Sequence, residues 1–174
     1  MRAFLLPAVL LVLLVAGWCS LVLTSQPLSP DQERSVMQAV QKIEDAGFSH
    51  EAFALRHLTA YRGSDNWWNA YIGHTNAYAA TNFPFEVLTL YRPFFTIAAD
   101  DTERAAILLH EAQHLTGARE EGALGYVWRV KARLGWTADK YGQTRVWKNT
   151  KEWTTAQVPG LFACGADQQT ECVQ

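Results

Sequence analysis

Residues 110 to 121 read HEAQHLTGAREE and contain the pattern His-Glu-x-x-His. Two histidines four positions apart project from the same side of an α-helix, one turn from each other. Imidazole nitrogens placed in this way can occupy two corners of a tetrahedral zinc ion. The stretch therefore predicts a metal-binding helix, and the alternative is an ordinary helix that carries two incidental histidines.

The residues before this pattern indicate an amphipathic helix that begins after Asp100 and Asp101, either of which can cap it. His110 and His114 lie off the apolar stripe of this helix, so neither is needed to complete the core. This placement favours a metal site. The stripe itself consists of five residues at helical spacing: Ala105, Leu108, Leu109, Ala112 and Leu115.

Glu111 is the expected catalytic residue. It lies about 100° around the helix from His110, where its carboxylate reaches a water molecule on the metal rather than the metal itself. Zinc lowers the pKa of such a water towards 7, and a carboxylate can take its proton as the water attacks a carbonyl carbon. The pattern thus supplies two ligands and the base of a metal-assisted hydrolysis, with Zn2+ as the expected cofactor.

HEAQH resembles the active-site helix of the zincin metallopeptidases, and the resemblance covers residues 100–124 and a preceding strand. It implies that His110 and His114 bind zinc, that Glu111 is the base, and that peptides or proteins are the substrates. It also implies a small sheet packed on the active-site helix. The edge strand of that sheet, FEVLTLY at 85–91, would hold an extended substrate by strand addition.

The chain departs from the best-known zincin subgroups at the third ligand. Residues 110–120 read HExxHxxGxxE, which is the metzincin spacing with Glu in place of the third His. Metzincins also carry a Met turn downstream of the zinc helix, whereas Met1 and Met37 both lie upstream of it. The resemblance is therefore to an atypical zincin with a short-spaced glutamate as the third ligand.

Two adjacent glutamates are the main candidates for that ligand. Gly117 can adopt the left-handed conformation that ends a helix, and a second helix then begins near Arg119. Glu120 is expected to point inward, where a carboxylate without a cation is costly to bury, and this favours Glu120 over Glu121. Glu152 is a further candidate. Without any metal, acidic residues in a first helical turn also stabilise the helix dipole.

Other polar residues receive weaker assignments. His74, in the sequence GHTN, is expected to be a turn residue rather than a contact of the site, and His50 and His57 receive no role. Stabilisation of an oxyanion requires a hydrogen-bond donor. Three unranked tyrosines are candidates for it: Tyr91, Tyr126 and Tyr141.

Residues 1–25 form a separate segment. Phe4 to Leu23 are 20 residues without a charge, which matches the roughly 20 residues that span a bilayer core. A signal peptide has a shorter apolar region and a small-x-small cleavage site, and we find no good site of that kind. Trp18 before Cys19 also argues against a lipoprotein signal. An uncleaved anchor is therefore favoured over a cleaved signal.

Residues 26–174 are accordingly expected outside the cytoplasm, in the periplasm or at the cell exterior, if the short basic N-terminus stays inside. Arg34 and Lys42 weaken this charge argument. Cys164 and Cys172 are the only cysteine pair beyond the apolar segment, and they predict a short disulfide loop formed in an oxidising compartment. Their spacing is too long for a zinc knuckle.

Composition limits the remaining possibilities. The chain has a net charge of −2, and its 15 basic residues are not clustered, so no nucleic-acid partner is expected. At 174 residues it accommodates one domain, which we expect at 26–174. Because this domain is small, its substrate cleft should be shallow, or formed against a partner or a membrane surface.

The predicted fold is α+β. An N-terminal membrane helix or signal precedes a small, mostly antiparallel sheet, which packs on the HExxH helix and on two or three further helices. The expected helices are 30–46, capped by Ser29, then one that begins after Asp100 or Asp101 and includes Leu115, then 119–134 and 142–157. The expected strands are 51–60, 67–73 and 85–91, of which the first is ambiguous with a helix.

Three functions follow from these features. The first is an exported or membrane-tethered zinc peptidase. The second is a non-catalytic exported interaction domain in which the metal only fastens two helices together, and the third is a zinc hydrolase that acts on cell-wall amides. Glu111 separates the first two, because a structural site has no use for a base.

Overall fold

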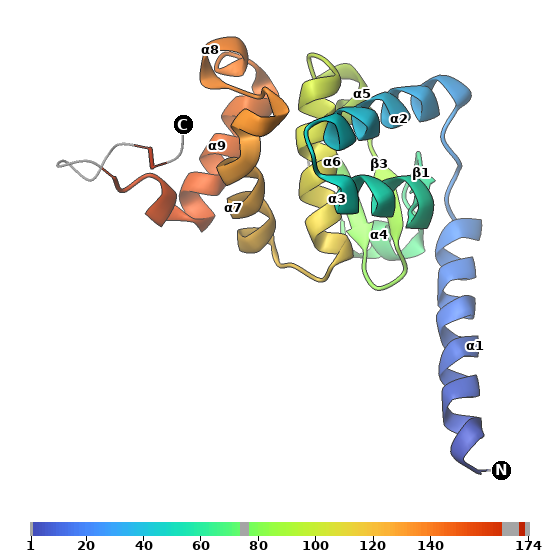
Figure 1. The fold of residues 1–174 in the computed structure, drawn as a ribbon. Helices are drawn as coiled ribbons and strands as arrows, with labels where there is room; N and C mark the ends of the chain where they lie inside the picture. Colours follow the sequence, from blue (N-terminus) through green and yellow to red (C-terminus); the bar gives the residue numbers. More distant parts are fainter. Residues whose placement is uncertain (1, 74–76, 165–170, 173–174) are drawn as a thin grey trace.

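The computed structural model describes residues 2–73, 77–164 and 171–172. The fold is α+β and mostly helical, with helices gathered around a small three-stranded sheet (Figure 1). The sheet contains β1 (Ala60–Arg62), β2 (Ala79–Asn82) and β3 (Val87–Leu90). The helices are α1 (Arg2–Leu23), α2 (Pro30–Asp45), α3 (Ser49–Phe53), α4 (Trp67–Ile72), α5 (Arg92–Thr96), α6 (Asp101–Leu115), α7 (Glu120–Val130), α8 (Ala138–Tyr141) and α9 (Arg145–Gln157), with single turns at Ala54–Leu58, Lys131–Leu134 and Pro159–Leu161.

The sheet is mixed rather than mostly antiparallel. Its order is β1-β3-β2, with β1 parallel and β2 antiparallel to β3. All four residues of β3 are buried, so both faces of the sheet are covered at this strand, and β3 also has a neighbouring strand on each side. The expectation that FEVLTLY is an edge strand is therefore wrong. The edge strand against the HExxH helix is β2, whose Thr81 is paired with Leu88 of β3 and hydrogen-bonded to Glu111 of α6.

The middle of the chain also differs from the sequence prediction. Residues 67–73 were predicted as a strand but contain α4, because the Asn66 side chain accepts hydrogen bonds from the backbone N–H groups of Trp68 and Asn69 and so caps a helix. The ambiguous segment 51–60 is helical up to Leu58. Strand β2 lies in a stretch that reads as turn material.

The longer helices match their predictions. Ser29 caps α2 in a capping box with Gln32, and Asp100 caps α6 through the backbone N–H groups of Thr102 and Glu103. Residues 26–174 contain, in addition to α6, more helices than the two or three that were expected. The additional ones are short, four to six residues each, and so leave no helical periodicity in the sequence.

Helix α1 extends away from the rest of the molecule (Figure 1). It is long and apolar enough to cross a membrane over Leu6–Leu23, and only its last turns contact the domain. At the other end of the chain, Cys164 and Cys172 form the predicted disulfide, with their Cα atoms 5.1 Å apart.

Candidate metal centre

The turn between α6 and α7 brings the candidate ligands together. Gly117 has a φ of +83°, the left-handed conformation expected for it. Its N–H donates to the His114 carbonyl (2.9 Å), and the N–H of Ala118 donates to the Gln113 carbonyl (3.0 Å). These two bonds form a Schellman motif. The chain consequently reverses within four residues, and Glu120 at the start of α7 returns beside the last turns of α6.

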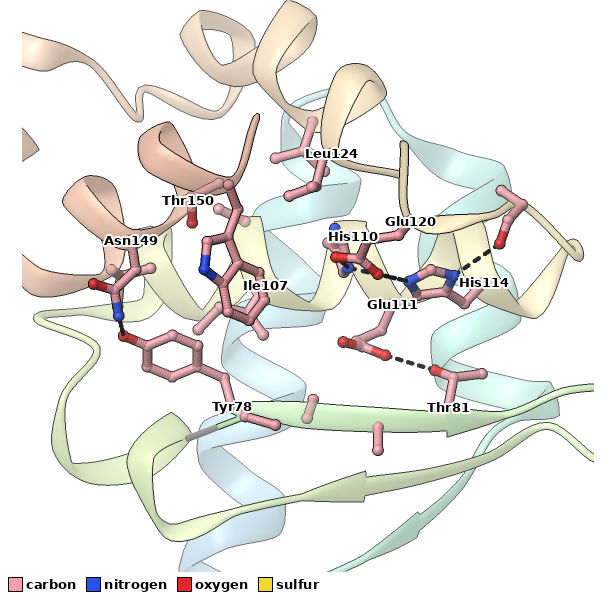
Figure 2. A pocket seen from close by; sticks show the side chains of 18 of the residues that line it. Tyr78, Thr81, Ile107, His110, Glu111, His114, Glu120, Leu124, Asn149 and Thr150 are labelled. Carbon is pink, nitrogen blue, oxygen red and sulfur yellow. Dashed lines mark hydrogen bonds and ion pairs between the residues drawn. The ribbon is translucent and has the colours of Figure 1, made fainter. Parts of the chain in front are cut away.

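Three side chains meet at this reversal (Figure 2). The Nε2 atoms of His110 and His114 are 3.1 Å apart. Glu120 Oε1 lies 3.5 Å from His110 Nε2, and Glu120 Oε2 lies 3.2 Å from His114 Nε2. Two imidazoles and one carboxylate therefore point at a common centre from two helices.

The spacing of these atoms fits a tetrahedral zinc ion. Ligand atoms about 2.0–2.1 Å from a tetrahedral metal lie about 3.3 Å from one another. The two histidine nitrogens are 3.1 Å apart, and each has a different oxygen of Glu120 as its neighbour, at 3.5 Å for His110 and 3.2 Å for His114, so each of these contacts is close to that value. Two histidines and one glutamate are also a donor set of catalytic zinc sites, which keep a fourth position open. The residues present thus fit the ion that the sequence implies.

The backbone fixes the tautomer of one ligand. His114 Nδ1 lies 2.8 Å from the carbonyl oxygen of Ala118. Because a carbonyl oxygen only accepts hydrogen bonds, Nδ1 carries the hydrogen, and in the neutral ring Nε2 presents its lone pair to the cluster. The α6–α7 turn thus orients the His114 ring as well as delivering Glu120.

The electrostatics of the cluster indicate a need for positive charge. Hydrogen bonds from His110 and His114 hold the pKa of Glu120 well below its usual range. The hydrogen bond to Glu120 raises the pKa of His114 to about 9, against the opposing effect of burial. In the metal-free protein a proton therefore takes the place that a cation would fill.

The structure separates the three carboxylates considered as the third ligand. Glu120 is half-buried and lies in the cluster. Its neighbour Glu121 is exposed, as is Glu152 on α9. Within the described residues, the His and Glu groups at metal-ligand separation are His110, His114 and Glu120.

Glu111 lies next to the ligands but does not belong to them. Its side chain is buried between α6 and β2, where Glu111 Oε2 accepts a hydrogen bond from the Thr81 hydroxyl (2.7 Å). Figure 2 shows its carboxylate on the β2 side of the two histidines, while Glu120 approaches from the α7 side. The Glu111 carboxylate is thus separate from the three candidate ligands, as the sequence prediction requires.

A cleft of about 730 Å³ runs from this centre between β2, α6, α7 and α9. Its volume is in the range of ordinary ligand sites. Figure 2 shows the ligands and Thr81 towards one end and Tyr78 with Asn149 at the other, with Ile107 between them. Helix α9 supplies the wall that the sequence analysis did not foresee.

The proposed oxyanion donors lie elsewhere. None of the three tyrosines is among the residues that line the cleft, and their hydroxyls donate to carboxylates: Tyr91 to Asp65, Tyr126 to Glu51 and Tyr141 to Asp100. His74 lies outside the described residues.

The cleft also contains polar residues that the sequence analysis missed. The Tyr78 hydroxyl lines it and accepts a hydrogen bond from Asn149 Nδ2 (3.1 Å), and burial raises its pKa. Thr81 also lines the cleft. Thr81 lies in β2 and Tyr78 directly before it, and this strand has no clear signal in the sequence.

No family model matches this chain, and neither does any curated protein or solved structure.

Proposed function

We propose that this chain is a zinc-dependent peptidase of the zincin type. His110, His114 and Glu120 would hold the metal, and Glu111 would act as the general base. The observation that carries the proposal is the convergence of two imidazole nitrogens, 3.1 Å apart, with a carboxylate whose two oxygens lie 3.5 and 3.2 Å from them, all within metal-ligand separation. The cleft beside them gives a substrate access to these atoms.

The chemistry divides between the ion and the side chains. Zinc, when bound, supplies a Lewis acid that acidifies water and polarises the carbonyl of the substrate. The Glu111 carboxylate takes a proton from the attacking water and passes it to the amide nitrogen, which leaves as an amine. The Thr81 hydroxyl holds Glu111 Oε2 by its 2.7 Å hydrogen bond and so limits rotation of the base.

Strand β2 is the element best placed to seat a polypeptide substrate. In the part of the chain that the structure describes it pairs only with β3, and residues 77–81 line the cleft. An extended peptide that adds to this edge would lie along α6 and its ligands. Tyr78 and Asn149, at the far end of the cleft, would contact polar groups of the substrate away from the scissile bond.

We also propose that α1 is an uncleaved anchor and that residues 26–174 lie outside the cytoplasm. The last turn of α1 is tied to the domain: Arg62 Nη2 donates to the Val22 carbonyl (2.6 Å), and Trp67 Nε1 donates to Ser20 Oγ (3.1 Å). Leu21 is buried. Cleavage near residue 25 would remove these contacts. The disulfide Cys164–Cys172 is consistent with an oxidising compartment.

One observation favours a second candidate function. The three ligands come from two consecutive helices, so a metal here would also fasten α6 to α7, as it would in a non-catalytic module. A purely structural site gains nothing from a carboxylate at position 111 or from an open cleft. The two functions therefore differ in what Glu111 does.

The test compares the parent with Glu111→Gln, both as full-length chains in detergent and loaded with zinc. Cleavage is followed on dye-labelled unfolded casein, and zinc content is measured on the same samples. The proposal expects equal zinc and a fall in cleavage rate of about 10²–10⁴-fold, the range for loss of a general base. Equal zinc with an unchanged rate, or with no cleavage by the parent, would contradict it and leave the metal with a structural role.

A further inference from the structure

Helix α4 presents large apolar side chains to the solvent. Trp67, Trp68, Tyr71 and Ile72 are 50%, 44%, 81% and 55% exposed, although the helix has only six residues. Phe83, in the turn between β2 and β3, is 57% exposed. We call these five residues the aromatic surface. So much exposed aromatic area on neighbouring elements is uncommon on a soluble domain unless another phase or molecule covers it.

The position of α4 relative to α1 indicates what covers this surface. The N–H of Trp67 donates to Thr24 Oγ1 (3.2 Å) and its indole N–H donates to Ser20 Oγ (3.1 Å). These acceptors flank Leu23, the last residue of the apolar helix. Helix α4 therefore begins at the level at which the candidate membrane span ends.

The turn between β2 and β3 lies at a deeper level along α1. The Phe85 ring packs on Gly17, and a Cβ placed there would lie 2.7 Å from a ring carbon. Six residues separate Gly17 from Leu23, which corresponds to about 9 Å along a helix. Phe85 therefore lies beside the candidate membrane span, about 9 Å from its C-terminal end at Leu23.

The junction between α1 and the domain is held by further hydrogen bonds. The Arg62 guanidinium donates to the Val22 carbonyl (2.6 Å) and to Ser25 Oγ (3.1 Å), which caps the end of α1 from strand β1. The N–H of Gly63 donates to the Gln26 carbonyl (2.8 Å). These bonds join the backbone at both sides of the junction, so the aromatic surface has a defined orientation relative to α1.

We infer that the aromatic surface rests in the boundary between headgroups and acyl chains of a phospholipid bilayer that α1 spans. Trp and Tyr are enriched at this boundary, where their rings are buried and their polar atoms stay hydrated. A bilayer also explains why Trp67, Trp68, Tyr71 and Ile72 are exposed together, directly beside an apolar helix.

The same surface reaches the candidate metal centre. Phe83 lines the cleft, and its ring lies against Gly117 of the α6–α7 turn. Figure 1 shows α4, the β2–β3 turn and the α6–α7 turn at the lower edge of the domain, the edge past which α1 extends, with α8 at the upper edge. The cleft consequently opens at the membrane surface. If the chain is the proposed peptidase, on which this step rests, its substrates are polypeptide segments that lie beside the bilayer.

The test measures depth with a spin label on the full-length chain in vesicles of phosphatidylcholine with a minority of phosphatidylglycerol. Cys19 is changed to Ser, and a nitroxide is attached at Tyr71→Cys or, separately, at Asp139→Cys on α8. Ile72→Cys gives a second position on the aromatic surface if the first variant folds poorly. The disulfide keeps Cys164 and Cys172 unlabelled.

Oxygen concentrates in the bilayer, whereas a nickel chelate stays in water. The inference expects oxygen to relax the label at 71 severalfold more effectively than the chelate, and the reverse at 139. If the label at 71 is as accessible to the chelate as the label at 139, the inference is overturned, and a protein partner becomes the occupant of the surface. The measurement uses neither zinc nor catalysis, so its failure is distinguishable from failure of the peptidase proposal.

Discussion

The two ends of helix α6 both contain buried polar groups, but they satisfy them differently. At the N-terminal end, Glu103 is fully buried, and it accepts hydrogen bonds from the Ala99 N–H (2.8 Å) and from the Thr144 hydroxyl. At the C-terminal end, the ring nitrogens of His110 and His114 face each other and Glu120.

This difference separates a site that is complete in the fold from a candidate metal site. Both oxygens of Glu103 have donors that the fold supplies, so that end of α6 is complete without a ligand. The C-terminal cluster brings two nitrogen lone pairs and a carboxylate to one point, which becomes favourable only with a proton or a metal ion between them. Adjacent lone pairs for which the fold supplies no hydrogen-bond donor therefore indicate a candidate metal site.

The largest effect is expected from removing the third ligand. Glu120→Ala should weaken zinc binding by at least a hundredfold, because even outer partners of a ligand are worth about 10–100-fold. Glu121→Ala is the matched control, since this neighbouring side chain is exposed and outside the cluster. Competition with a fluorescent chelator measures both affinities. Equal affinities, or a larger loss in Glu121→Ala, would show that the third ligand is misassigned.

The opposite end of α6 should respond in stability rather than in metal binding. Glu103→Ala leaves the Ala99 N–H without its acceptor and the Thr144 hydroxyl with only the Tyr141 carbonyl, at a cost of about 1–3 kcal/mol in the free energy of unfolding. Denaturant unfolding measures this cost. The zinc affinity of the folded variant should equal that of the parent. Loss of zinc affinity in this variant would show that the two ends of α6 do not act independently.

A smaller effect is expected at the turn that delivers Glu120. Gly117 has a φ of +83°, so Gly117→Ala should cost about 1 kcal/mol and weaken zinc binding as the turn relaxes. Gly160→Ala is the control, because Gly160 has no positive φ and open space at its Cβ. Thermal unfolding and zinc titration of both variants check the prediction. Identical behaviour of the two would mean that the turn geometry is unimportant.

The smallest effects are expected from pH. The folded pKa of His114, about 9, lies above its unfolded value of about 6.5, so the stability from its pair with Glu120 is present below pH 6.5. It is lost as the pH rises through about 9. In chelator, Tm should therefore fall by a few degrees over this range, and less in His114→Gln. A fall of the same size in both proteins would rule out this pair as its source.

Asp100, at the N-terminal end of α6, titrates at the other extreme. Burial raises its pKa, but hydrogen bonds from the Tyr141 hydroxyl and from the backbone of Glu103 and Thr102 outweigh this effect and lower it. Its contribution to stability is therefore present above its unfolded pKa and lost as the pH falls through the lowered one. In denaturant unfolding as a function of pH, Asp100→Asn should flatten the fall of the unfolding free energy on the acid side and leave its slope on the alkaline side unchanged.

Local sequence signals predicted what depends on neighbours along the chain. The spacing of His110 and His114 fixes their common face, Gly117 ends the helix, and the next helix then begins at Glu120. Helical periodicity also favoured Glu120 over Glu121 as the inward residue. Each of these features follows from residues within about one helical turn of one another.

Features that depend on distant pairing were not visible in the sequence. Strand β2 is recognisable only by its register with β3, and α4 looks like a strand until the cap at Asn66 is seen. The donor for Glu103, Thr144, lies 41 residues away, and α9 closes the cleft from beyond position 145. Such contacts are set by tertiary packing, which overrides local propensity.

The central claim is that the cluster at the C-terminal end of α6 binds zinc. It is tested most directly by mass spectrometry of the metal content of the full-length chain, purified in detergent without chelator and shown to be folded by near-UV circular dichroism. His114→Ala removes a ligand, and His50→Ala is the control at a histidine outside the cluster. The account predicts one zinc per chain in the parent and in His50→Ala, and none in His114→Ala. A parent without zinc, or His114→Ala with as much zinc as the parent, would contradict it.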